Sequence, residues 1–178
     1  MNPQPLEQRI YQQRQKYQIK ARTDIILPET SRDLLHRLDT FNAPYLEEKL
    51  LQKDVFNTSE EYLQHLVEFK KYVFLATITP ENMAMTSPKV DEVWHQFILF
   101  TREYHAFCSQ FVGRYLHHTP KTSHTPMNEE IPIDQFVKAY KTYFGEIPEL
   151  WNISSAKTSC SSCCSSGCAS CGSGPSVH

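Results

Sequence analysis

Residues 87–120 concentrate the side chains of this chain that could do chemistry. The stretch contains Asp91, four of the eight histidines and the one cysteine that precedes the carboxyl-terminal tail. These histidines are His95, His105, His117 and His118, and the cysteine is Cys108. Imidazole, carboxylate and thiolate groups are the side chains that bind transition metals. The stretch therefore predicts either a metal site or a buried polar cluster that locks a helical hairpin.

Two pairs within the stretch have helical spacing. Asp91 and His95 are one turn apart, so both could reach one ion, or the carboxylate could orient the imidazole. His105 and Cys108 would also be neighbours, and would either share a metal or hydrogen-bond in a packed interface. Because Cys108 would lie near the carboxyl end of its helix, the helix dipole disfavours its thiolate and argues against a cysteine nucleophile.

The two pairs could not bind the same ion on one straight helix. The distance from His95 to Cys108 would be about 20 Å along the helix axis. The pair His117 and His118 follows Gly113 and could complete either site. Joining the second pair needs only a tight turn, whereas joining the first requires the segment to run back along the helix. Adjacent histidines usually point in different directions, so we expect one ligand from them.

A second group of potential ligands lies in the tail, residues 152–178. Serine, cysteine and glycine dominate it, and its cysteines are Cys160, Cys163, Cys164, Cys168 and Cys171. Their spacing is too close for a zinc ribbon but suits a small thiolate cluster around Zn(II) or Cu(I). Redox-active thiols, a substrate region for cysteine modification and a flexible linker are the alternatives. With little apolar material to bury, the tail should be disordered unless it is crosslinked.

The domain that positions the central stretch is expected to be helical. Apolar residues recur at helical spacing through residues 1–151, and the chain has few glycines. We therefore predict an all-α fold, a compact bundle of about six helices, followed by the tail. The expected helices cover residues 6–22, 29–42, 44–55, 57–79, 88–112 and 132–144.

Residues 57–79 are expected to form the central helix, with Thr58 or Ser59 as its cap. Its buried stripe would consist of Tyr62, Leu66, Phe69, Val73 and Ala76. A second stripe carries Glu61, His65, Glu68 and Tyr72. Facing helices build carboxylate and histidine metal sites with such spacing, but a solvated helix face is the interpretation that we prefer.

The helix that carries the candidate ligands has recognisable ends. Ser87 followed by Pro88 predicts an N-cap with proline in the first helical position. Gly113 predicts the C-cap, which gives one helix of about 25 residues. Gly145 should end the last helix in the same way, and Trp151 should close the domain by packing.

Part of the stretch also resembles a known family. It reads VDEVWH at 90–95, ILFTREY at 98–104, FC at 107–108, glycine at 113 and HHTP at 117–120. This pattern is similar to that of the glycine-rich domain-containing protein-like family, with its VDxVWH segment, and is limited to residues 87–120. The resemblance implies a helical domain and no particular reaction, and this chain has a short tail in place of a long glycine-rich region. The corresponding motif residues are Asp91, Trp94, His95, Tyr104, Cys108 and His117.

Composition excludes several classes of protein. The net charge of -2 predicts neither a dominant nucleic-acid surface nor a membrane surface. The sequence has no apolar run long enough to span a bilayer, and its first residues lack the apolar core of a secretory signal. We therefore expect a cytoplasmic protein whose cysteines are reduced thiols or metal ligands.

Two ligand-rich regions in one chain lead us to expect a metal-handling protein. It would capture or transfer a soft metal, and its partner would be a metal donor or acceptor. The alternative is a protein-interaction module whose motif is structural and whose tail is a linker or modification target. The third hypothesis is a metal-dependent enzyme built on Asp91, His95 and a later histidine. It ranks below the other two because the sequence offers no separate general base.

Overall fold

The computed structural model describes residues 16–79, 83–118 and 133–153, in which all regular structure is helical. The α-helices are α2 (Glu29–Thr40), α3 (Pro44–Gln52), α4 (Ser59–Ile78), α5 (Pro88–Leu99), α6 (Thr101–Phe107) and α7 (Ile133–Phe144). A π-helical turn, η1 (Cys108–Val112), continues α6, and a 3-10 turn, η3 (Glu149–Trp151), follows α7. The predicted all-α fold of about six helices is confirmed. The predicted tail cysteines lie outside the described residues.

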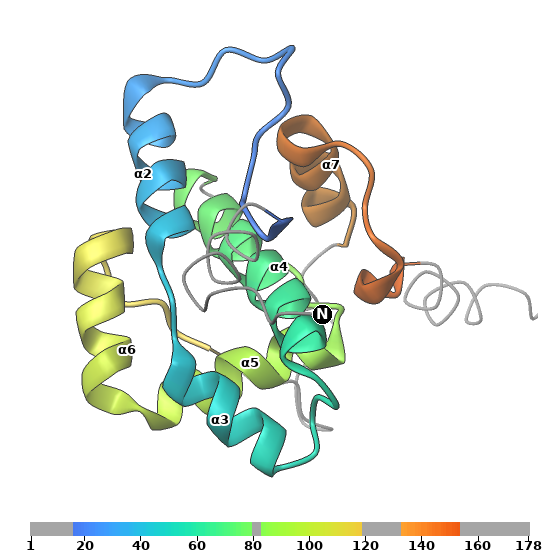
Figure 1. The fold of residues 1–178 in the computed structure, drawn as a ribbon. Coiled ribbons are helices and arrows are strands. Elements are labelled where there is room, and N and C mark those ends of the chain that lie inside the picture. The colour runs from blue at the N-terminus through green and yellow to red at the C-terminus, as the bar shows by residue number, and fades with distance from the viewer. Residues whose placement is uncertain (1–15, 80–82, 119–132, 154–178) are drawn as a thin grey trace, which may run out of the picture.

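Helix α4 is the central element of the bundle (Figure 1). It packs against α2, α3 and α5, while α7 lies on its other side. The residues that it buries include Tyr62, Leu66, Phe69 and Val73, as its apolar stripe predicts, whereas Ala76 of the same stripe is half-buried. Within the described part of the chain, no helix combines the length and the apolar character needed to cross a membrane.

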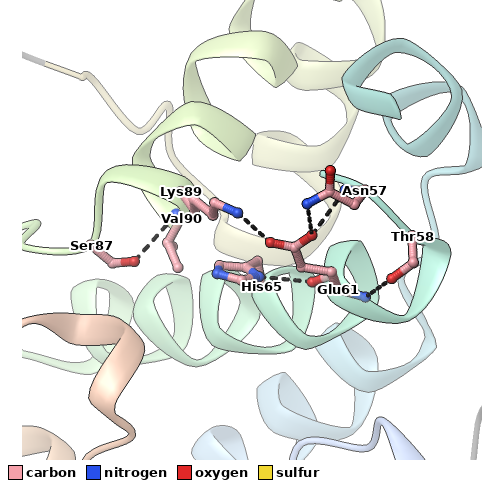
Figure 2. Close-up of polar contacts among 7 residues, drawn as sticks. All are labelled: Asn57, Thr58, Glu61, His65, Ser87, Lys89 and Val90. Carbon is pink, nitrogen blue, oxygen red and sulfur yellow. Dashed lines mark hydrogen bonds and ion pairs between the residues drawn. The ribbon is translucent and has the colours of Figure 1, made fainter. Parts of the chain in front are cut away.

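The amino-terminal ends of α4 and α5 are capped and joined (Figure 2). The Thr58 side chain accepts a hydrogen bond from the Glu61 backbone N–H at 3.1 Å, and Glu61 in turn accepts one from the Asn57 backbone N–H at 2.9 Å. Glu61 also forms an ion pair with Lys89 at the start of α5. Lys89 first, and then the Asn57 amide, hold the pKa of Glu61 below its usual value. The predicted cap therefore also fixes one helix to the other.

The predicted single helix over residues 88–112 is interrupted. Helix α5 ends at Leu99, and Phe100 leaves the helical conformation (φ -84°, ψ 66°) before α6 begins. The bend brings the rings of Phe97 and Tyr104 within 5.1 Å of each other in the core. Burying one large apolar side chain is worth about 1.5–3 kcal/mol, whereas a backbone hydrogen bond exchanged for one with water is worth about 1 kcal/mol. The free energy gained by burying these rings therefore exceeds the free energy lost when the helical hydrogen bonds are interrupted at Phe100.

The end of this region matches the prediction. The π-helical turn η1 stops at Gly113, whose φ of +77° lies in the left-handed region. Residues with a side chain adopt this conformation at a cost, which glycine avoids. Gly113 thus ends the helix and turns the chain back toward α5.

The predicted helix over residues 6–22 is only partly within the described residues, and residues 18–22 are not helical. Their backbone groups have tertiary partners instead. The N–H of Ile19 donates to the Asp39 carboxylate at 2.9 Å, and the N–H of Arg22 donates to the Tyr143 carbonyl at 2.9 Å. Because Ile19 is also buried, this segment gains more from lying between α2 and the end of α7 than from helical bonds.

The second stripe of α4 was expected on a solvated face, a prediction that its burial contradicts. Glu68 is 4% exposed and His65 is 7% exposed. The stripe does not converge on one point either. Glu61 pairs with Lys89, His65 donates its Nδ1–H to the Glu61 carbonyl at 2.7 Å, and Tyr72 donates to the Met83 carbonyl at 2.9 Å.

Glu68 is the polar centre of the contact between α4 and the carboxyl-terminal part of the domain. Its Oε2 accepts hydrogen bonds from the Tyr140 hydroxyl and the Trp151 indole, both at 2.7 Å. Its Oε1 is 2.7 Å from the Lys71 ammonium. Trp151 is fully buried and packs 4.5 Å from the Phe136 ring, so it closes the domain as predicted.

Candidate metal site

Asp91, His95 and His118 converge at one end of α5. One ligand atom from each of the three lies within 4.8 Å of the others. His118 Nε2 is 2.7 Å from Asp91 Oδ1, and His95 Nε2 is 3.7 Å from Asp91 Oδ2. Each oxygen of one carboxylate therefore faces a different imidazole nitrogen.

Local sequence places the first two of these residues. Ser87 caps α5, its hydroxyl accepting from the Val90 N–H at 3.4 Å, and the Asp91 N–H bonds to the Ser87 carbonyl at 2.9 Å. Asp91 thus lies in the first turn, where the helix dipole favours a negative charge. His95 follows one turn later on the same face.

The third member of the cluster, His118, comes from the return segment, residues 114–118. After Gly113 this segment runs back to α5, where the His118 ring meets the Trp94 ring edge-on with 4.5 Å between centroids. Trp94 donates its indole N–H to the Tyr104 hydroxyl at 2.9 Å. That hydroxyl donates to the Leu116 carbonyl at 2.5 Å. Buried aromatic groups therefore hold the segment that carries His118.

The cluster is anchored on its inner side and open on its outer side. The His118 side chain is 9% exposed, whereas those of Asp91 and His95 are 30% and 39% exposed. His95 Nδ1 lies 3.7 Å from a Glu92 carboxylate oxygen, so a second carboxylate faces this ring on the side opposite to Asp91. Burial raises the pKa of the neighbouring Tyr72, and the charge of Asp91 adds to this effect, so Tyr72 remains a neutral donor.

The spacing of the ligand atoms suits one ion. Zinc bonds to nitrogen and oxygen are about 2.0–2.2 Å long, so two ligand atoms on a tetrahedral ion lie roughly 3.3 Å apart. The 2.7 Å and 3.7 Å separations of the cluster lie on either side of this value. An ion could enter after small side-chain movements, provided that His118 gives up its hydrogen bond to Asp91.

The structure does not bring the other expected ligands into this site. His117 is exposed, and its ring lies 4.9 Å from that of Tyr115. His105 is exposed, whereas Cys108 is 1% exposed, so the two do not share a surface. Helix α6 buries Tyr104 and leaves His105 in solvent, and the turn η1 that follows it buries Cys108. In the three described ranges, Asp91, His95 and His118 are the group of potential ligands that meets.

Two contributions to the site were missed from the sequence. The role of Glu92 beside His95 has a weak signal in the spacing of three residues. The role of Tyr104 has none, because its partners Trp94 and Leu116 are not at helical spacing from it and meet it only through the bend at Phe100. The resemblance had marked Trp94 and Tyr104 without assigning a role to either.

The fold and the cluster define the class of this protein, an all-α domain that carries two imidazoles and a carboxylate at one partly open site. The UCP032817-like family model matches residues 33–138, more than half of the chain, and the protein therefore belongs to the UCP032817-like family. This match corrects the expected relation to the glycine-rich domain-containing protein-like family, which relied on residues 87–120 alone. No curated protein and no solved structure matches the chain.

Proposed function

We propose that this protein binds a transition-metal ion, and Zn(II) in the first instance, through Asp91, His95 and His118. The supporting observation is that donors from α5 and from the return segment meet within 4.8 Å. Imidazole and carboxylate are common zinc ligands. Three protein ligands would leave one position of a tetrahedral ion for water or for a further ligand.

The tail extends this proposal to metal handling. Five thiolates in residues 152–178 would take a soft ion, Cu(I) or Zn(II), and a flexible tail would exchange it with a donor or acceptor protein. Such a role requires reduced thiols, so we place the protein in the cytoplasm. This part of the proposal rests on the sequence of the tail.

One observation favours a second candidate function. The 2.7 Å hydrogen bond between His118 and Asp91 is largely shielded from solvent on the His118 side. Such a bond would also lock the return segment onto α5 without any metal. The domain would then be an interaction module for a protein partner, with the cluster as a structural element.

The substitution Asp91→Asn separates the two functions. The asparagine oxygen would still accept a hydrogen bond from His118, so the lock would remain and the stability loss should be about 1 kcal/mol or less. A neutral amide is a poor zinc ligand, and losing even a residue that orients a ligand costs about 10–100-fold in metal affinity. We therefore expect Asp91→Asn to weaken zinc binding by more than about 100-fold.

The measurement uses the full chain with its accessible thiols alkylated by iodoacetamide. Cys108 is 1% exposed and should be spared. Zinc affinity is measured by competition with a chromogenic chelator, and stability by thermal melting. His105→Ala, an exposed histidine outside the cluster, is the matched control and should bind zinc normally. A wild-type protein that retains no zinc, or an Asp91→Asn variant that binds as well as wild type, would contradict metal binding here.

A further inference from the structure

Tyr104 lies at the centre of a buried chain of hydrogen bonds behind the cluster. Its hydroxyl accepts from the Trp94 indole N–H at 2.9 Å and donates to the Leu116 carbonyl at 2.5 Å. Tyr104 is 1% exposed, and Leu116 and Trp94 are each 5% exposed. One phenol therefore joins α5, α6 and the return segment inside the domain.

The partners of Tyr104 are the immediate neighbours of two proposed ligands. Trp94 precedes His95 on α5, and its ring lies against that of His118. Leu116 lies two residues before His118 on the return segment. The chain of bonds therefore reaches the cluster from both of the segments that supply its ligands.

The Leu116 bond selects the register of the return segment. Sliding this segment by one residue would move it by roughly 3.3–3.6 Å, so the Tyr104 hydroxyl would lose the acceptor of its proton and the buried Leu116 carbonyl would lose its donor. Metal ligands must be held within about 0.5 Å of their positions. Burial raises the pKa of Tyr104, so its hydroxyl keeps its proton and remains a donor at neutral pH.

The geometry assigns Tyr104 as the residue that positions His118 opposite Asp91 and His95. It acts through the carbonyl of Leu116 and through the indole of Trp94, and it is a positioning residue, not a ligand. This assignment rests on the proposed metal-binding function for its consequence on affinity, but the position of His118 can be observed without any metal.

The test compares Tyr104→Phe with Tyr115→Phe in the full chain with alkylated thiols. Both variants lose one phenolic hydroxyl, but Tyr115 is 44% exposed and its ring contact with Tyr104 would persist. We expect Tyr104→Phe to weaken zinc binding by about 10-fold or more, the usual effect of removing a group that orients a ligand. Tyr115→Phe should stay within about twofold of wild type.

A second variant keeps the test decisive if Tyr104→Phe does not fold. Trp94→Phe retains an aromatic ring beside His118 and leaves the bond from Tyr104 to Leu116, but removes the N–H that orients the hydroxyl. We expect a loss of affinity that exceeds twofold but is smaller than that of Tyr104→Phe, because the Leu116 bond remains. Affinities within twofold of wild type for every folded variant among Tyr104→Phe and Trp94→Phe would overturn the assignment.

The ring centroids of His95 and His118 lie 4.4 Å apart. Nuclear Overhauser effects between these two rings provide a readout that a general loss of stability would not change. We expect Tyr104→Phe to weaken them in the folded, metal-free protein, while Tyr115→Phe leaves them intact. If the wild-type protein binds no zinc, the proposed function fails. The contacts between the two histidine rings then test on their own whether Tyr104 positions His118. Contacts that persist unchanged in Tyr104→Phe would then overturn its role.

Discussion

At the level of single residues, the carboxylate of Asp91 is the group around which the cluster is arranged. Its two oxygens face His118 and His95 at 2.7 Å and 3.7 Å. A metal ion would replace a proton between the same atoms, because a zinc-bound imidazole nitrogen cannot carry hydrogen. Metal-free and metal-bound forms would thus use the same three side chains.

The adjacent histidines offer a sharp prediction at this scale. His118→Ala removes a proposed ligand and should abolish zinc binding by the thiol-alkylated chain, whereas His117→Ala should leave the affinity within about twofold of wild type. The reason is that His117 is exposed beside Tyr115, while His118 faces Asp91. Isothermal titration with zinc measures both variants. Equal losses of affinity would show that the return segment matters as a whole and that His118 is not a ligand.

At the level of elements, the contact between α4 and α7 depends on a buried charge. Glu68 accepts hydrogen bonds from Tyr140 and Trp151 and pairs with Lys71, whose side chain is 17% exposed. Removing the Glu68 carboxylate while its partners remain would leave buried hydrogen-bond donors without an acceptor. Glu68 is therefore the polar anchor between α4 and the segment of α7 and η3, beside the ring contacts that also join them.

We expect Glu68→Ala to lower the free energy of unfolding by about 3 kcal/mol, because it leaves the buried donors of Tyr140 and Trp151 without an acceptor and removes the carboxylate that pairs with Lys71. Glu68→Gln keeps one acceptor oxygen and should lose less. Urea denaturation followed by tryptophan fluorescence measures both. Glu60→Ala, at an exposed position of the same helix, is the control and should lose much less stability than Glu68→Ala, because the ion pair of Glu60 with Lys16 is exposed to solvent. A Glu68→Ala variant as stable as this control would contradict the buried clamp.

The helix ends could be predicted from the sequence, whereas the bend could not. Thr58, Ser87 and Gly113 act on backbone groups within a few residues of themselves, so their signals are local. The break at Phe100 depends on rings from distant parts of the chain, including Tyr45 at 4.9 Å. A helical pattern on either side of Phe100 carries no information about that contact.

The same distinction applies to the candidate site. The spacing of Asp91 and His95 identified two of its members, because both lie on one helix. The choice of His118 over His117 depends on the register of the return segment, which Tyr104 fixes by its bond to Leu116. Proximity in the sequence instead favoured a site that joins the two adjacent histidines to Cys108, but Cys108 is buried in the core.

At the level of the whole molecule, the division into a helical domain over residues 1–151 and a tail over 152–178 stays a prediction. The burial of Trp151 is consistent with a carboxyl-terminal limit of the domain at this residue. If the two parts bind metal separately, the domain should hold one site with nitrogen and oxygen ligands, which resist oxidation. The tail should hold a site with thiolate ligands.

Ending the chain at Asn152 tests this division. The shortened chain should keep the stability of the domain and about one zinc per chain, whereas the full chain without alkylation should retain additional Zn(II) or Cu(I). The reason is that the deletion removes five thiolates and leaves Asp91, His95 and His118 in place. Mass spectrometric metal analysis after dialysis measures both chains. Equal metal content in the two would contradict a role for the tail in metal handling.

The bond from the Arg22 N–H to the Tyr143 carbonyl has a consequence for synthesis on the ribosome. Residues 18–22 emerge before any of the described helices, but the carbonyl that accepts this bond is made near the end of the domain. Chains are made at about 5–20 residues per second, so this segment waits several seconds for its partner. Arg22 therefore gains its backbone partner late, whereas Ile19, three residues earlier, can bond to Asp39 much sooner.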